Sequence, residues 1–232
     1  MKIPLLTLIS LLTLFSHTQA KDAATRTCRI VFPDRPAGTP KTLHLFDGST
    51  SQQVELSSMN LSPLYKLPPG AIQLKLLHAK VDDPKAVSPD APSVEIPADY
   101  TDFILLVSSH PENKIAPFKL QAINLATENF KLGQTLWINH SDKTVEGKLG
   151  EQSLSLKPES SQIVDSPISD KGMPTSGYFN ASFTYQVQGK DTFEPITEQQ
   201  WWHDAKCRHL GFINNSGGKL PKIYFFRDFR DP

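Results

Sequence analysis

Short apolar runs separated by turn-forming residues recur along this chain, and their spacing predicts an all-β protein. Residues 72–79 and 178–187 alternate apolar and polar side chains, as expected for strands with one buried face. Residues 103–107 are apolar without interruption, which indicates a central strand covered on both faces. The further strands predicted on the same grounds are residues 29–32, 42–46, 53–56, 64–67, 118–125, 135–139, 145–148, 153–156, 210–213 and 222–226.

Turn formers and helix signals support the same fold class. Proline outnumbers glycine, 19 to 12, and most prolines fall between apolar runs, which favours short strands over long helices. Asp47-Gly48 predicts a tight turn between two strands. The best helix candidate is residues 197–205, with Thr197 as its N-cap. Residues 81–97 and 158–176 are predicted to be long loops, because proline, aspartate and serine are frequent in them.

Two segments of the chain echo two later ones. Residues 42–46 resemble residues 135–139, and each opens a series of short strands. Residues 103–107 resemble residues 210–213, and each is followed by a polar loop, a proline and an alternating strand. The two pairs have different sequence offsets, so a duplication requires an insertion, which residues 158–176 can supply.

This echo leaves two domain organisations open for an Ig-like antiparallel β-sandwich. One has two tandem sandwich units, residues 21–127 and residues 128–232. The other treats residues 21–232 as one all-β domain, in which the similarity between short strands arose by chance.

The first twenty residues have the pattern of a secretory signal peptide. Lys2 is followed by an apolar run, and Thr18 and Ala20 supply the small residues of a cleavage site. We therefore expect residues 1–20 to be removed and the protein to be secreted or periplasmic. No membrane span is expected after this cleavage, because no later run approaches the ~20 apolar residues that a spanning helix requires.

The two cysteines and the charge balance bear on whether the protein has a disulfide, a metal site or a nucleic-acid partner. Cys28 and Cys207 predict one disulfide in an oxidising compartment, and the alternative is two separate thiols. The absence of a CxxC motif argues against a structural zinc site, and no metal or other cofactor is predicted. Acidic and basic residues balance at 24 each, so no electrostatic field for nucleic acid is expected.

One stretch resembles a known family. Residues 43–46, the Asp47-Gly48 turn, a short strand and then Tyr65-Lys66-Leu67-Pro68-Pro69-Gly70 before an alternating strand are similar to secreted bacterial Ig-like domains of unknown function. The resemblance covers about forty residues of the chain. It implies a sandwich fold and export, and it carries over no catalytic residue.

The motifs of common enzymes are absent from the sequence. GxSxG, HExxH, GxxxxGK[ST] and GxGxxG do not occur, so no catalytic residue is predicted and the protein is not expected to be an enzyme. His203, Cys207 and His209 form the most metal-like local cluster, but we interpret them as histidines that flank a structural cysteine.

Three tryptophans are the candidate ligand-binding residues. Trp137, Trp201 and Trp202 could stack on sugar rings if exposed, whereas buried they would fill a core. In a strand, Trp201 and Trp202 point to opposite faces, so at least one can be exposed.

The predicted function is an exported, non-enzymatic structural or binding module of the cell envelope or extracellular space, with an unknown protein or polysaccharide partner. The alternatives are a carbohydrate-binding module that uses exposed tryptophan, and a small secreted hydrolase with a site in the long loops.

Overall fold

The computed structural model describes residues 26–125, 130–215 and 220–229. The predicted signal peptide at residues 1–20 and the predicted boundary between residues 127 and 128 therefore lie outside the described residues. The described chain contains 18 β-strands and a single 3₁₀ turn, η1 (Pro84–Ala86), so the all-β fold class is confirmed. In these described ranges, no helix has the length and apolar character needed to cross a membrane.

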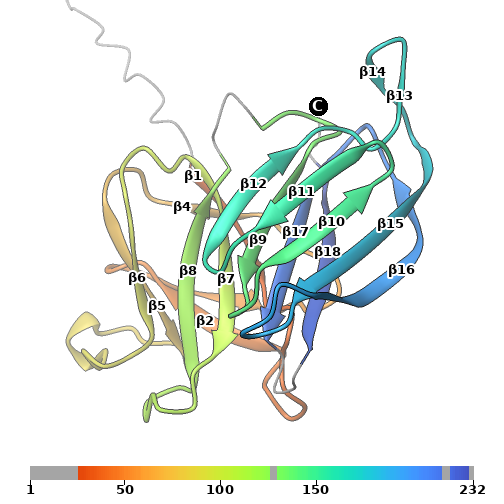
Figure 1. Cartoon of the computed structure of the whole chain (residues 1–232). Coiled ribbons are helices and arrows are strands. Elements are labelled where there is room, and N and C mark those ends of the chain that lie inside the picture. The colour runs from red at the N-terminus through yellow and green to blue at the C-terminus, as the bar shows by residue number, and fades with distance from the viewer. Residues whose placement is uncertain (1–25, 126–129, 216–219, 230–232) are drawn as a thin grey trace, which may run out of the picture.

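The strands before residue 126 form two four-stranded sheets (Figure 1). The first inner sheet has the order β4-β1-β7-β8 and the first outer sheet the order β3-β2-β5-β6. Their strands are β1 (Arg26–Val31), β2 (Thr42–Phe46), β3 (Ser51–Glu55), β4 (Tyr65–Leu67), β5 (Ile72–Leu77), β6 (Ser93–Ile96), β7 (Asp102–Ser109) and β8 (Phe118–Asn124).

The strands after residue 129 form two further four-stranded sheets and a small hairpin. The second inner sheet has the order β12-β9-β17-β18 and the second outer sheet the order β11-β10-β15-β16, while β13 and β14 pair with each other. The strands are β9 (Thr135–His140), β10 (Val145–Leu149), β11 (Gln152–Leu156), β12 (Ser160–Val164), β13 (Ser169–Asp170), β14 (Met173–Pro174), β15 (Gly177–Gln186), β16 (Phe193–His203), β17 (Arg208–Asn215) and β18 (Pro221–Asp228).

The two sheet pairs have the same strand order. If the β13–β14 hairpin is set aside, each strand from β9 onward takes the position of one strand from β1 to β8. Strand β9 then corresponds to β1, and β17 corresponds to β7. The echo between residues 103–107 and 210–213 falls on equivalent strands, but the match of residues 42–46 with 135–139 is wrong, because β2 corresponds to β10.

Each inner sheet contains one parallel pair, which the antiparallel prediction did not include. Strand β1 pairs with β7 in parallel, and β9 pairs with β17 in parallel, while the other strand pairs are antiparallel. Parallel strands occur mainly in sheets that are covered on both faces. The inner sheets meet this condition, as their packing shows.

Three apolar layers hold the four sheets together. The first lies between the first inner and outer sheets and includes Leu74 and Leu105. The second lies between the second inner and outer sheets and is centred on Trp137, whose ring centroid is 5.0 Å from that of Phe183. The third lies between the two inner sheets and contains side chains of both, among them Leu106 and Phe212. The layers therefore stack as outer, inner, inner and outer sheets.

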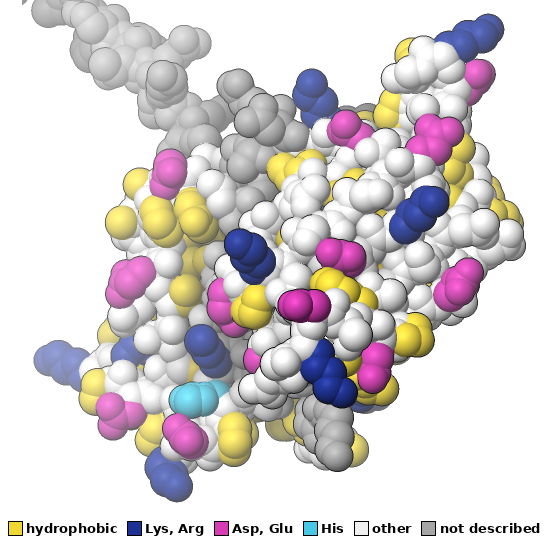
Figure 2. All heavy atoms as spheres, viewed as in Figure 1, with side chains coloured by type: hydrophobic (Ala, Val, Ile, Leu, Met, Phe, Trp, Pro, Cys, Tyr) yellow, Lys and Arg dark blue, Asp and Glu magenta, His cyan; other side chains and the backbone are white. Residues whose placement is uncertain are grey.

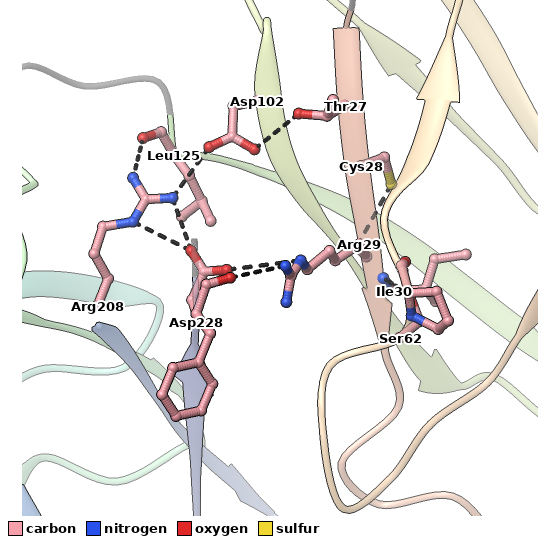
Figure 3. A network of polar contacts seen from close by, with 11 residues as sticks. Thr27, Cys28, Arg29, Ile30, Ser62, Asp102, Leu125, Arg208 and Asp228 are labelled. Carbon is pink, nitrogen blue, oxygen red and sulfur yellow. Dashed lines mark hydrogen bonds and ion pairs between the residues drawn. The ribbon is translucent and has the colours of Figure 1, made fainter. Parts of the chain in front are cut away.

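A buried ion-pair network joins the two inner sheets beside the third apolar layer (Figure 3). Arg208 of β17 donates from Nη2 to Oδ2 of Asp228 at 2.8 Å and to Oδ2 of Asp102 on β7 at 3.1 Å. Its Nη1 donates to the carbonyl oxygen of Leu125 at 2.9 Å. Arg29 of β1 donates from Nη2 to the carbonyl of Phe229 at 2.8 Å. These contacts fix the relative position of the sheets, because each crosses from one sheet pair to the other or anchors a group that does.

The expected helix at residues 197–205 is wrong, because these residues belong largely to β16. The segment pairs along its length with β15, and its alternation puts Trp201 in the second apolar layer and Trp202 at the surface. The N-cap preference of Thr197 does not determine the structure here, because the pairing with β15 overrides it.

The two predicted long loops are also partly wrong. Residues 81–97 include η1 and β6, and Val81, Val87 and Ala91 cover Phe46 and Leu77 on the outer side of the first outer sheet. Residues 158–176 include β12 and the β13–β14 hairpin.

Candidate functional site

Two of the three candidate tryptophans pack into the apolar layer between the second inner and outer sheets. Trp137 is fully buried, and its ring stacks on that of Trp201 with a centroid separation of 6.2 Å. Trp201 also packs 5.3 Å from Phe225 of β18. Both side chains therefore contribute to the apolar layer between the second inner and outer sheets, Trp137 as a fully buried residue and Trp201 as a half-buried one.

Trp202 lies on the outer face of the second outer sheet and forms an exposed aromatic pair with Tyr178. The side chains are 40% and 69% exposed, and their ring centroids lie 5.0 Å apart in an edge-to-face arrangement. Residues Tyr178 and Trp202 are direct partners in the β15–β16 register, which explains why the rings meet. The sequence reading missed Tyr178, although the alternation of β15 assigns it to the outward face.

The same face continues away from the aromatic pair as a row of polar side chains. Asn180 lies opposite Gln200, and Ser182 lies opposite Glu198 on β16 and Lys148 on β10. A shallow groove of about 590 Å³ crosses this part of the sheet, with Ser153, Ser155 and Ser182 in its lining. Over β10, β11 and β15, Figure 2 shows acidic and basic side chains that are scattered rather than gathered by sign.

An aromatic pair beside hydroxyl and amide groups can bind a sugar chain. Aromatic side chains offer a large apolar surface at small entropic cost, and amides and hydroxyls both donate and accept hydrogen bonds. We name the surface formed by Tyr178, Trp202, Asn180 and Gln200 the aromatic face.

The predicted disulfide is wrong, because both cysteines are free and buried. Cys28 faces the apolar layer between the first inner and outer sheets, whereas Cys207 lies in the second sheet pair, 3.5 Å from Nε2 of His209. The first and last described strands, β1 and β18, both belong to the inner sheets, but these two side chains enter separate interiors. Burial raises the pKa of both thiols, so neither is a reactive thiolate at neutral pH.

His203, Cys207 and His209 come together as a buried cluster. The two imidazole centroids lie 4.8 Å apart, both side chains are fully buried, and Nδ1 of each lacks a hydrogen-bond partner among the described residues. Burial lowers the pKa of His203, and burial together with the neighbouring His203 lowers the pKa of His209 to about 4. Over the described ranges, no three His, Cys, Asp or Glu side chains are arranged to hold a metal ion.

Ser166 and His203 form a serine–histidine pair beside a surface pocket, but its proton arrangement does not suit a nucleophile. Ser166 Oγ lies 2.9 Å from Nε2 of His203 and donates its proton to the carbonyl oxygen of Ile168 at 2.6 Å. His203 must then donate to Ser166 and cannot act as its base in this geometry. Ser166 thus anchors the buried histidine in place.

Comparisons with known proteins add little to this description of the site. No family model matches the chain, and no curated protein matches it. A solved structure that does match is a DUF3823 family protein from Bacteroides ovatus ATCC 8483, with 10% sequence identity and a TM-score of 0.22, over 76% of this chain and 97% of that chain. A likeness at this level carries no argument. The β-sandwich architecture implied by the sequence resemblance therefore stands on the strand pairing alone.

Proposed function

We propose that this protein is an exported, non-catalytic binding module that takes carbohydrate on its aromatic face. The observation that carries the proposal is the Tyr178–Trp202 pair, two large aromatic side chains held at the surface by direct strand pairing. Exposed apolar side chains that adjoin one another indicate an interaction surface, whereas those scattered singly are ordinary. The signal-like pattern of residues 1–20 supports export.

The neighbours of the pair favour a sugar over an apolar peptide. Asn180 and Gln200 lie two residues further along each strand, so their amides point to the same face as the rings. A protein partner of the usual kind would favour a larger apolar centre surrounded by a polar rim. Here the polar groups begin immediately beside two rings, which suits a ring-shaped ligand that carries hydroxyl groups on its edges.

The test is native affinity electrophoresis of the mature chain through gels that contain soluble β-glucan, xylan, glucomannan or starch. We expect retardation by at least one polysaccharide, and a loss of affinity of about tenfold, or ~1.4 kcal/mol, for Trp202→Ala and for Tyr178→Ala. Phe193→Ala is the matched control, because Phe193 is an exposed aromatic residue of the same strand β16 at its opposite end.

Unchanged retardation of the Trp202→Ala variant would remove the aromatic face from the binding site. Migration unaffected by all four polysaccharides would overturn carbohydrate binding. Circular dichroism of each variant confirms that the fold is retained, which is expected because both side chains lie outside the apolar layers.

A further inference from the structure

A cleft lies between the two inner sheets, separate from the aromatic face. It is at the opposite end of the inner-sheet interface from the buried ion-pair network of Arg208 and Asp228. Its volume is about 250 Å³, and its lining includes Ser108, Lys119 and Gln121 from the first inner sheet and His140 and Asn214 from the second. Binding sites for small molecules often form where two packed units meet. The volume is below that of a pocket for a drug-sized molecule, so an occupant must be small.

The cleft is open because the apolar rows that pack the two inner sheets end there. On β7 the row Ile104 and Leu106 continues into Ser108. On β17 the row Leu210 and Phe212 continues into Asn214. On β9, the row of Leu136 and Ile138 likewise continues into His140. All three strands change from apolar to polar side chains at the same level of the interface. The strand sequences therefore determine where the cleft forms.

Two buried polar atoms in the cleft lining lack partners among the described residues. They are Nε2 of His140 and Oδ1 of Asn214. These residues are direct partners in the parallel β9–β17 register, so the two side chains stand next to each other on one face. An unsatisfied buried polar group destabilises the protein, and a ligand that supplies hydrogen bonds to both atoms recovers that cost.

Glu159 lies beside the second ring nitrogen of His140. Its Oε2 lies 3.5 Å from Nδ1 of His140, which favours the tautomer with the proton on Nδ1 and leaves Nε2 as an acceptor. Glu159 has a backbone φ of 56°, a left-handed conformation that is unfavourable for a residue with a side chain. The turn before β12 holds this strained residue where its carboxylate reaches the histidine.

The charges around the cleft disfavour an anionic ligand. Lys119 contributes one positive charge, whereas Glu159 and Asp34 contribute two negative charges. A free anion is therefore disfavoured. Nε2 of His140 and Oδ1 of Asn214 both accept hydrogen bonds, while Ser108 and Lys119 can donate them, so the complementary ligand carries several hydroxyl groups.

We propose that this inter-sheet cleft binds a neutral, polyhydroxylated molecule of monosaccharide size. Hydroxyl groups of the ligand donate to His140 and Asn214, and its oxygen atoms accept from Ser108 and Lys119. The site does not depend on the aromatic face, because none of its lining residues belongs to the second outer sheet.

The first experiment is a titration of the ¹⁵N-labelled protein with D-glucose, D-galactose, D-mannose and N-acetyl-D-glucosamine, followed by amide chemical shifts. At least one sugar is expected to shift the side-chain amide signals of Gln121 and Asn214 in a saturable way. The amide signals of Asn180 and Gln200 on the aromatic face act as the internal control. Shifts confined to these two control residues, or no saturable shift with any of the four sugars, would overturn the proposal.

The second experiment takes the sugar that binds and measures its affinity for variants of the protein. Asn214→Leu keeps the side-chain size and removes the amide, and a loss of affinity of about tenfold or more is expected. Trp202→Ala is expected to leave this affinity unchanged, even if it abolishes polysaccharide binding. An affinity lost in Trp202→Ala and retained in Asn214→Leu would assign the sugar to the aromatic face. Displacement of the sugar by an equal concentration of acetate or of ethanolamine would contradict a neutral ligand.

Discussion

The buried histidine cluster makes the stability of this protein depend on pH in a way that can be calculated. His209 is fully buried between its own strand neighbours, with its ring stacked 5.1 Å from that of Phe225 and close to His203. Its pKa falls from 6.5 to about 4, because burial and the adjacent imidazole disfavour its charged form. The groups that face it are His203, Asp204, Arg227 and the thiol of Cys207.

The sign of the effect follows from the number of protons bound. Between pH 6.5 and pH 4 the unfolded chain protonates His209 and the folded chain does not, so the free energy of unfolding falls as the pH falls. The stability that neutral His209 provides is fully present above pH 6.5 and is lost progressively down to about pH 4. For these two pKa values the loss between pH 7.5 and pH 4.5 is about 2–3 kcal/mol.

The assay is urea unfolding at pH 7.5 and pH 4.5, followed by far-ultraviolet circular dichroism. His209→Phe preserves the stacking on Phe225 and removes the titrating group. The variant is therefore expected to lose about 2–3 kcal/mol less than the wild-type protein over this pH interval. His110→Phe is the control, because His110 is exposed, and it should follow the wild-type profile.

Equal losses in the wild-type protein and the His209→Phe variant, within about 0.5 kcal/mol, would refute the argument. That result would mean that the cluster admits water or rearranges to accommodate a charge. The same measurement on His203→Phe separates the two rings, because removing His203 also removes part of the repulsion that lowers the pKa of His209.

Three further predictions follow from the packing. Arg208→Met leaves the carboxylate of Asp228 buried without its main partner, so it should lower the free energy of unfolding by about 3–5 kcal/mol. Adding Asp228→Leu to this variant should restore part of the lost stability. Urea unfolding measures both effects. Thiol labelling should count two reactive thiols in urea and none in the native protein, and a mass consistent with an internal disulfide would contradict the separate positions of Cys28 and Cys207. Gly211→Ala should lower stability by about 1–3 kcal/mol, because its Cβ would overlap the ring of Trp137; a thermal midpoint equal to that of the wild-type protein would show that the ring can move aside.

The strands of this protein could largely be predicted from its sequence, because alternation is a local signal. The pattern of β15 and the unbroken apolar run of β7 both correspond to strands, and the run marks a sheet covered on both faces. Strand β16 was missed because its side chains are mostly exposed, so its strand state comes from pairing with β15 rather than from its own pattern.

The candidate site was less predictable, since it depends on pairing across strands. Trp202 was recognised as a candidate, but its partner Tyr178 follows only from the β15–β16 register. The cysteine pairing failed for a similar reason, because proximity of two chain segments does not determine which side of a sheet each side chain enters. The inter-sheet cleft required the packing of the two inner sheets, which no local pattern specifies.

The face-to-face contact of the two inner sheets resembles the interface of a dimer whose partners are joined in one chain. Separate subunits would have to associate, and the dimer would dissociate on dilution. A covalent link replaces that dependence with a fixed effective concentration. The joined halves are also free to change independently, so the aromatic pair can occur on one outer sheet while a loop covers the other. A cleft at their junction can then combine side chains that no symmetric pair of identical subunits would bring together.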